Sequence, residues 1–151
     1  MRPKGLSRQD DFPPTLGKRQ GSAVNDKNVK ILIIDDEPEI TEIVDIFLSN
    51  AGYQVITQNS AVDGVKAAEK FHPTLILLDI MMPGMDGYEV CNVLKANPMT
   101  TNIPVVFLTG KDSRDDSGRS FKVGGDLFVK KPFSCERLLD IVKIVLMSVA
   151  K

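Results

Sequence analysis

Acidic residues, one threonine and one lysine directly follow short apolar segments of this chain. The acidic run 35–37 follows the first segment, Asp79 ends another, Thr109 ends a third and Lys131 follows a fourth. Several carboxylates brought into one pocket remain ionised at low cost only when a cation lies among them. Because these oxygen ligands come without histidine or cysteine, the sequence favours Mg²⁺ over zinc.

These residue types suit phosphoryl transfer. Mg²⁺ held by few protein ligands is the usual partner of a phosphoryl group. A carboxylate can act as a nucleophile and form an aspartyl-phosphate. A lysine ammonium neutralises the charge on the phosphoryl oxygens, and a threonine hydroxyl can donate a hydrogen bond to one of them. The set therefore predicts metal-dependent transfer of a phosphoryl group to a carboxylate.

Strands and helices alternate along the chain and would bring these residues together. Short apolar runs predict strands over 29–35, 53–57, 74–79, 103–109 and 126–130. The segments between them predict helices over 37–52, 60–71, 88–96, 112–123 and 134–150. Apolar strands buried on both faces imply a doubly wound α/β fold with a parallel sheet. Its functional site is expected at the carboxyl ends of the strands.

The helical segments predict which faces are buried. In the first helix the expected apolar stripe is Ile40, Ile43, Val44, Phe47 and Leu48. In the last helix the expected core stripe is Leu138, Leu139, Ile141, Val142, Val145, Leu146 and Val149, with Ile144 and Met147 outside it. The helix over 112–123 is expected to be short or frayed because Gly118 lies in its middle.

Four motifs carry a resemblance to a known family: IIDDEPE, ILLDIMMPGMDGYEV, IPVVFLTG and GGDLFVKKPF. Together they resemble the receiver domain of two-component response regulators, over residues 29–151. The resemblance implies a flavodoxin-like fold with strand order 2-1-3-4-5. It also implies a phosphoacceptor signalling domain that catalyses only its own phosphorylation and dephosphorylation. The phosphoryl donor would be a phosphohistidine on a sensor histidine kinase or on a histidine phosphotransfer protein.

The resemblance assigns the acidic cluster residue by residue. Asp79 matches the phosphoacceptor. Asp36 matches the acid that binds Mg²⁺ directly, and Asp35 matches the acid that holds the metal mainly through water. The backbone carbonyl of Met81 matches the third protein ligand. Mn²⁺ is expected to substitute for Mg²⁺. Taken alone, the position of Asp35 after a strand favours a helix N-cap over a metal ligand.

The resemblance also implies a conformational switch. Thr109 matches the switch hydroxyl, Lys131 the phosphate-contacting lysine and Phe128 the aromatic residue that moves on activation. The bond before Pro132 is a candidate cis peptide. The output face would consist of the helix over 112–123, the strand over 126–130 and the last helix.

The output residues expected on this face are Phe121, Ile144 and Met147. Because the chain contains no helix-turn-helix or other output segment, we expect a downstream protein target or a homodimer there, and no direct DNA binding. Two scattered exposed apolar residues on the last helix are the alternative reading of Ile144 and Met147.

Composition excludes other classes. The net charge of -1 argues against non-specific binding to nucleic acid, and no apolar run is long enough for a membrane span. Two distant cysteines fit a cytoplasmic protein without disulfides. Residues 1–28 are expected to be a flexible N-terminal extension, with six basic and three acidic residues. This extension is either solvated or docks on an acidic partner or lipid surface.

Three other functions would each require a different pattern in the sequence. A metal-dependent phosphatase would carry its nucleophile after the first strand, within a DxD pattern. A non-phosphorylated scaffold would lack one of the acids, the threonine or the lysine. A flavin or nucleotide binder would need a phosphate-binding loop where the acidic run 35–37 stands. Within the family, Met1 and an end near the last helix favour a free-standing regulator over part of a hybrid kinase or a regulator without its output domain.

Overall fold

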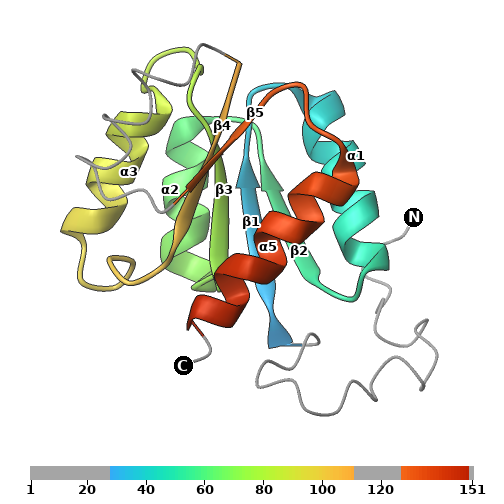
Figure 1. The fold of residues 1–151 in the computed structure, drawn as a ribbon. Helices are drawn as coiled ribbons and strands as arrows, with labels where there is room; N and C mark the ends of the chain where they lie inside the picture. The colour runs from blue at the N-terminus through green and yellow to red at the C-terminus, as the bar shows by residue number, and fades with distance from the viewer. Residues whose placement is uncertain (1–27, 111–126, 150–151) are drawn as a thin grey trace.

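The apolar runs form one parallel sheet in the computed structural model, which describes residues 28–110 and 127–149. The strands are β1 (Lys30–Ile34), β2 (Gln54–Gln58), β3 (Leu75–Asp79), β4 (Val105–Thr109) and β5 (Leu127–Lys130). The described helices are α1 (Pro38–Asn50), α2 (Ala61–Phe71), α3 (Gly87–Ala96) and α5 (Cys135–Val149). The strand order is β2-β1-β3-β4-β5, which confirms the predicted doubly wound fold (Figure 1).

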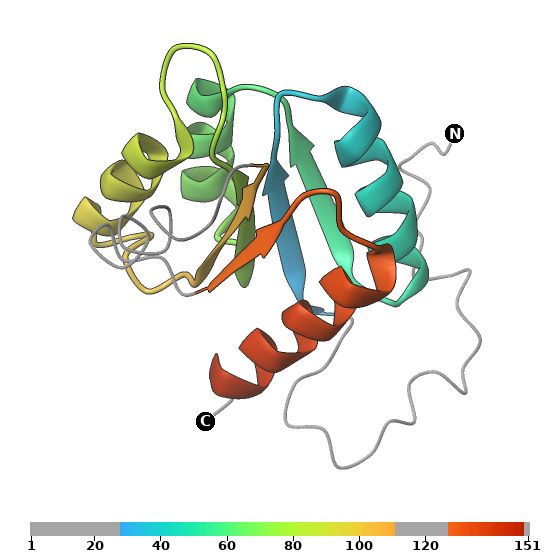
Figure 2. The same ribbon diagram turned by 45° about the horizontal axis from the view of Figure 1, so that its top comes forward.

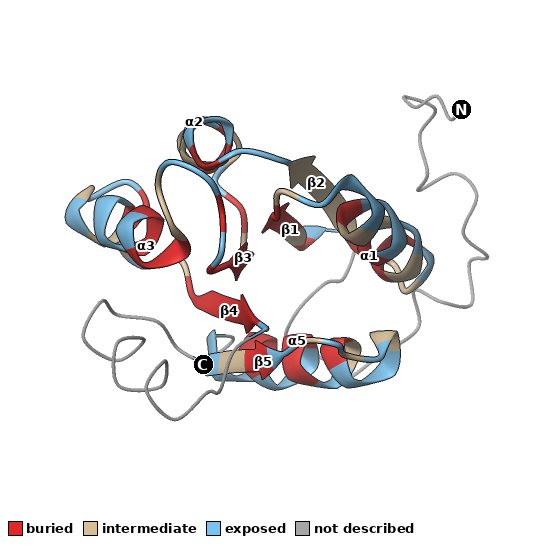
Figure 3. Cartoon of the chain, turned by 90° about the horizontal axis from the view of Figure 1, so that it is seen from above, coloured by how far each residue is buried: buried red, intermediate tan, exposed pale blue. Residues whose placement is uncertain are grey.

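Two helical layers enclose the sheet. Figure 3 shows α1 and α5 on one face and α2 and α3 on the other. Side chains of a strand point alternately to the two faces, so Ile31 and Ile33 join the core under α1 and α5. Leu32 and Ile34 join the second core, under α2 and α3. Because central strands contact helices on both sides, every residue of β3 and β4 is buried.

Local signals fix several helix ends. Ser60 caps α2, where its side chain accepts a hydrogen bond from the backbone N–H of Asp63. Gly52 follows α1 with a φ of 106°, a conformation that glycine adopts without strain. His72 ends α2 in the left-handed region, consistent with a loop position. The predicted boundaries differ from these by one or two residues.

Two buried positions were predicted wrongly. Ile43 is 54% exposed, because Thr41 and Ser49 occupy core-facing positions of α1 instead. Their hydroxyls are satisfied locally: Thr41 donates to the carbonyl of Pro38, and Ser49 donates to the Asp45 carboxylate. Val149 is 46% exposed at the last residue of α5, and Figure 2 shows this end of the helix away from the strands.

Part of the sequence prediction lies outside the described residues. This concerns nearly all of the extension 1–28, the helix over 112–123 and the output residue Phe121. Among the helices that the structure describes, none is long and apolar enough to cross a membrane.

Candidate functional site

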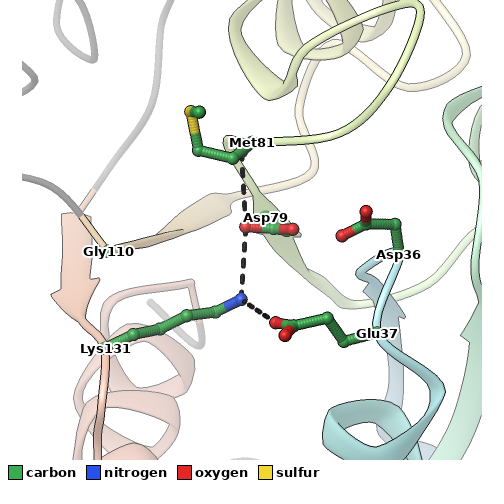
Figure 4. A pocket seen from close by; sticks show the side chains of 6 residues that line it. All are labelled: Asp36, Glu37, Asp79, Met81, Gly110 and Lys131. Carbon is green, nitrogen blue, oxygen red and sulfur yellow. Dashed lines mark hydrogen bonds and ion pairs between the residues drawn. The ribbon is translucent and has the colours of Figure 1, made fainter.

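The carboxyl ends of four strands meet at one edge of the sheet. Ile34 pairs with Leu78 between β1 and β3, which brings the following residues, Asp35 and Asp79, side by side. β4 and β5 lie on the other side of β3, with Thr109 at the end of β4. A cavity of about 330 Å³ opens at this edge, and Figure 4 shows its lining residues Asp36, Glu37, Asp79, Met81, Gly110 and Lys131.

Three carboxylates gather beside the cavity. Asp35, Asp36 and Asp79 each offer an oxygen, and these oxygens all lie within 4.8 Å of one another. Asp35 and Asp79 are buried, while Asp36 is more accessible. The backbone N–H of Glu37 donates to Asp35 Oδ1 at 3.0 Å, and Asn59 Nδ2 donates to the Asp35 carbonyl at 2.8 Å. Backbone and side-chain contacts therefore fix the acidic turn after β1.

Lys131 reaches into this cluster from the loop after β5. Its Nζ lies 2.9 Å from Asp35 Oδ2, 3.1 Å from Glu37 Oε1 and 3.3 Å from Asp79 Oδ1. Its backbone N–H donates to the Thr109 carbonyl at 2.6 Å, and the Lys131–Pro132 peptide bond is cis. Burial by itself lowers the pKa of Lys131, but the close contact and charge of Asp35 and the charge of Asp79 raise it overall.

The environment of Asp79 disfavours its charged form. Burial is the main cause and the neighbouring charge of Asp35 the second, and together they raise the pKa of Asp79 to about 7. The ammonium of Lys131 acts in the opposite direction but offsets only part of this effect. A further cation beside Asp79 would favour its carboxylate form.

The donor set fits a hard divalent cation. Asp35 Oδ2 is buried and accepts no hydrogen bond from any described residue, although the Lys131 ammonium lies beside it as an ion pair. A buried carboxylate oxygen without a hydrogen bond is costly unless a cation or water completes its environment. Carboxylate oxygens without nitrogen or sulfur ligands are what Mg²⁺ prefers.

The other residues predicted for the site are Thr109, Phe128 and Met81. Thr109 is fully buried at the end of β4. Phe128 is half-buried on β5, paired with Phe107 in the sheet, and packs against the core under α2 and α3. Met81 donates its backbone N–H to Asp79 Oδ1 at 3.4 Å and has a half-exposed side chain. Thus Asp35, Asp36, Asp79 and Lys131 come together, whereas Phe128 lies outside the cavity.

Ile144 and Met147 are not part of this site. They are 56% and 69% exposed on α5, as their position outside the core stripe predicts.

Two residues of the site have no assigned role in the sequence interpretation. Glu37 was visible only as the third acid of the run after β1, and its contact with Lys131 spans 94 residues. Asn59 follows the edge strand β2 and also donates to Thr41 Oγ1 at 3.1 Å. No spacing pattern pointed to Asn59.

The turn after β3 ends in a capping box. The Asp86 side chain accepts from the backbone N–H of Glu89, and Glu89 Oε1 accepts from the backbone N–H of Asp86. Asp86 is thus the N-cap residue of α3.

The next residue, Gly87, lies directly against the backbone at the end of β3. A Cβ added to Gly87 would meet the Asp79 carbonyl oxygen and would lie 2.8 Å from Ile80 Cα. Because backbone atoms cannot rotate away, we expect Gly87→Ala to destabilise the protein by about 1–3 kcal/mol. The measurement is chemical unfolding, with Gly110→Ala as the control, since the described residues leave open space around that position. Equal stability of the two variants would contradict this close approach.

Comparison with known proteins decides the family. A family model described as the response regulator receiver domain matches residues 31–143. The chain belongs to the response regulator receiver domain family. Receiver domains are signalling domains of two-component systems and phosphorelays, and they interact with histidine kinases and phosphotransfer proteins. The family assignment from the four sequence motifs is therefore confirmed.

Individual relatives agree with this assignment. The receiver domain is 39% identical over 118 residues to the protein PilG of Pseudomonas aeruginosa, which covers 76% of this chain and 85% of PilG. It is 42% identical over 120 residues to RpaA of Synechocystis, described as a DNA-binding dual master transcriptional regulator. That match covers 78% of this chain and 48% of RpaA, so the chain spans about half of that relative's length.

Solved structures show the same fold. The chemotaxis protein CheY4 of Vibrio cholerae superposes with a TM-score of 0.75 at 29% identity, covering 78% of this chain and 98% of CheY4. The signal receiver domain of a histidine kinase from Syntrophus aciditrophicus superposes with a TM-score of 0.73 at 36% identity, covering 80% of this chain and 92% of the other.

Proposed function

We propose that Asp79 of this receiver domain accepts a phosphoryl group from a phosphohistidine, carried by a sensor histidine kinase or a histidine phosphotransfer protein. The observation that carries the proposal is the position of the Asp79 carboxylate. It lines an open cavity, 3.3 Å from the Lys131 ammonium and within 4.8 Å of carboxylate oxygens of Asp35 and Asp36. The Asp79 carboxylate would be the nucleophile, and a cation and further carboxylates suited to a metal lie directly beside it.

Four groups would hold the metal in this proposal: the carboxylates of Asp35, Asp36 and Asp79 and the backbone carbonyl of Met81. Mg²⁺, or Mn²⁺ in its place, would neutralise negative charge on the phosphoryl oxygens. Asp35 is kept in place by the backbone N–H of Glu37 and by the contact of Asn59 with its carbonyl. The chain thereby orients its acidic groups before any ligand arrives.

The transfer conserves charge and atoms. A carboxylate oxygen of Asp79 attacks phosphorus, a P–O bond forms, and the P–N bond to the donor imidazole breaks. The imidazole leaves with the electron pair and takes up a proton. Lys131 donates to a phosphoryl oxygen, and the Thr109 hydroxyl donates to another.

A conformational switch would follow the transfer. Thr109 and Phe128 would move together and so couple the phosphoryl group to β5 and α5. Output would be a change in protein–protein contacts, with no direct DNA contact by this domain. Within the described residues Cys91 and Cys135 form no disulfide, which suits the cytoplasmic location that we propose.

The test of this function is intact mass after incubation with Mg²⁺ and acetyl phosphate. We expect one added phosphoryl group in the wild type. The Asp79→Asn variant and the wild type in excess chelator should remain unmodified. A fully folded wild type that binds no Mg²⁺ and gains no phosphoryl group would overturn the proposal.

The exposed residues of α5 give a prediction about output. We propose that Ile144 and Met147 form part of the face through which the phosphorylated protein binds a second copy or a downstream target. Replacing both by aspartate should weaken that association at least about tenfold, because charge at the centre of an apolar contact is costly. Light scattering before and after phosphorylation, or binding to an identified target, measures the effect.

The matched control is Val62→Asp, which changes an equally exposed apolar residue on α2. Its association should equal that of the wild type. A strict monomer in both phosphorylation states, together with target binding that the double variant leaves unchanged, would contradict a role for this face.

A further inference from the structure

The side chain of Glu37 crosses the mouth of the site instead of capping its own helix. Glu37 occupies the N-cap position of α1, yet within the described chain its side chain accepts no capping hydrogen bond. Its carboxylate instead lies 3.1 Å from Lys131 Nζ (Figure 4). The Glu37 side chain is 55% exposed and lines the cavity.

Three carboxylates surround the Lys131 ammonium in this arrangement, and its Nζ donates hydrogen bonds to Glu37 Oε1 and Asp79 Oδ1. An ammonium carries three N–H groups. Three carboxylate oxygens lie within 3.3 Å of Lys131 Nζ, one each from Asp35, Glu37 and Asp79. A phosphoryl oxygen attached to Asp79 would therefore compete with these carboxylates for the N–H groups and the positive charge of Lys131.

The contact with Glu37 is the one that the structure makes easiest to release. Asp35 is fully buried, so separating its charge from Lys131 would be costly. Asp79 itself carries the phosphoryl group. An exposed carboxylate such as Glu37 loses little when it exchanges an ion pair for water.

We propose that Glu37 is a positioning residue that competes with the phosphoryl group for the Lys131 ammonium. This inference rests on the function proposed for Asp79. While the site is unphosphorylated, Glu37 holds the ammonium at the mouth of the cavity. When an anion arrives on Asp79, Glu37 must give up Lys131, and its own negative charge opposes the anion. Glu37 thus weakens the binding of any phosphoryl-like anion at Asp79.

Beryllofluoride, an anion that imitates a phosphoryl group on a carboxylate, tests this competition. Its affinity in the presence of Mg²⁺ is measured by calorimetry. Glu37→Gln removes the charge at nearly constant size, and we expect about three- to tenfold tighter binding than in the wild type. Glu37→Asp keeps the charge but shortens the side chain, so its affinity should lie between the two.

The matched control is Glu39→Gln, which removes the same charge two residues further along α1, outside the residues that line the cavity. Its affinity should stay within about twofold of the wild type, because an exposed charge farther from the anion is screened. The gain in beryllofluoride affinity of Glu37→Gln should also shrink at high salt. A purely structural role of Glu37 would instead change the thermal midpoint of unfolding.

The outcomes separate this inference from the proposed function. If the wild type binds beryllofluoride and Glu37→Gln binds it equally well or more weakly, the competition is wrong and the phosphoacceptor role stands. An equal gain in affinity in Glu37→Gln and Glu39→Gln would also overturn the competition. Loss of any nearby negative charge would then explain the tighter binding. If the folded wild type neither binds beryllofluoride nor becomes phosphorylated, both proposals fail.

Discussion

Replacing Lys131 by alanine should slow phosphoryl incorporation from acetyl phosphate by about 100-fold or more. The expectation follows from the position of Nζ, 3.3 Å from Oδ1 of the Asp79 carboxylate that would accept the phosphoryl group. Removing one preorganised donor aimed at developing negative charge costs about 10²–10³ in rate. The measurement is the time course of intact mass at saturating Mg²⁺.

The same substitution should destabilise the metal-free protein. Lys131 is the cation beside the fully buried Asp35 carboxylate. Leaving a buried charge without its partner costs about 3 kcal/mol or more. Protonation of Asp79, whose pKa is raised to about 7, should lower the negative charge beside Asp35 and so reduce this loss at low pH. Unfolding in chelator at pH 8 and pH 5 measures both effects.

Lys130→Ala provides the control for both measurements. Lys130 is the adjacent lysine, and its exposed side chain belongs to the end of β5. It should keep the wild-type phosphorylation rate and stability. If Lys131→Ala matched Lys130→Ala in both assays, the ammonium would have no part in the reaction or in balancing the acidic cluster.

The second large effect is expected from Asp79→Asn in the absence of metal, where the variant should be more stable than the wild type. The pKa of Asp79 rises from 3.8 to about 7 on folding, mainly through burial and then through the charge of Asp35. A raised pKa means that the neutral form of Asp79 favours the folded state. This stability is fully present below about pH 4 and is lost as the pH rises through about 7.

The stability difference between the two proteins should therefore depend on pH. At pH 5 the difference between their thermal midpoints in chelator should be clearly smaller than at pH 8. At pH 8 the Asn variant should melt at least about 5 °C higher, because it lacks the buried charge. Asp140→Asn, a change on the exposed surface of α5, should show no such trend. A constant difference between Asp79→Asn and the wild type from pH 5 to pH 8 would contradict the raised pKa.

Much of the fold followed from local patterns. Short β-branched runs predicted the strands, since segments buried on both faces must be apolar throughout. Right-handed crossovers restrict how such strands are ordered. The order 2-1-3-4-5 itself was implied by the family resemblance, and the observed order β2-β1-β3-β4-β5 agrees with it. Exposure within helices was harder to predict. Ile43 was assigned to the buried face of α1 because the apolar period includes it, but Ile43 is exposed while Thr41 and Ser49 are buried.

The sequence by itself determined which residue types stand at the strand ends, and therefore the family and the kind of chemistry expected. These signals are local, since a residue's position after a strand depends on the strand's own apolar run. Only the tertiary structure decided that one Lys131 ammonium contacts Asp35, Glu37 and Asp79 together, and that Asn59 holds the carbonyl of Asp35. Such contacts depend on side-chain directions and on the spacing of strands far apart in the chain. The raised pKa of Asp79 has the same origin, because burial and neighbouring charge exist only once the strands have assembled.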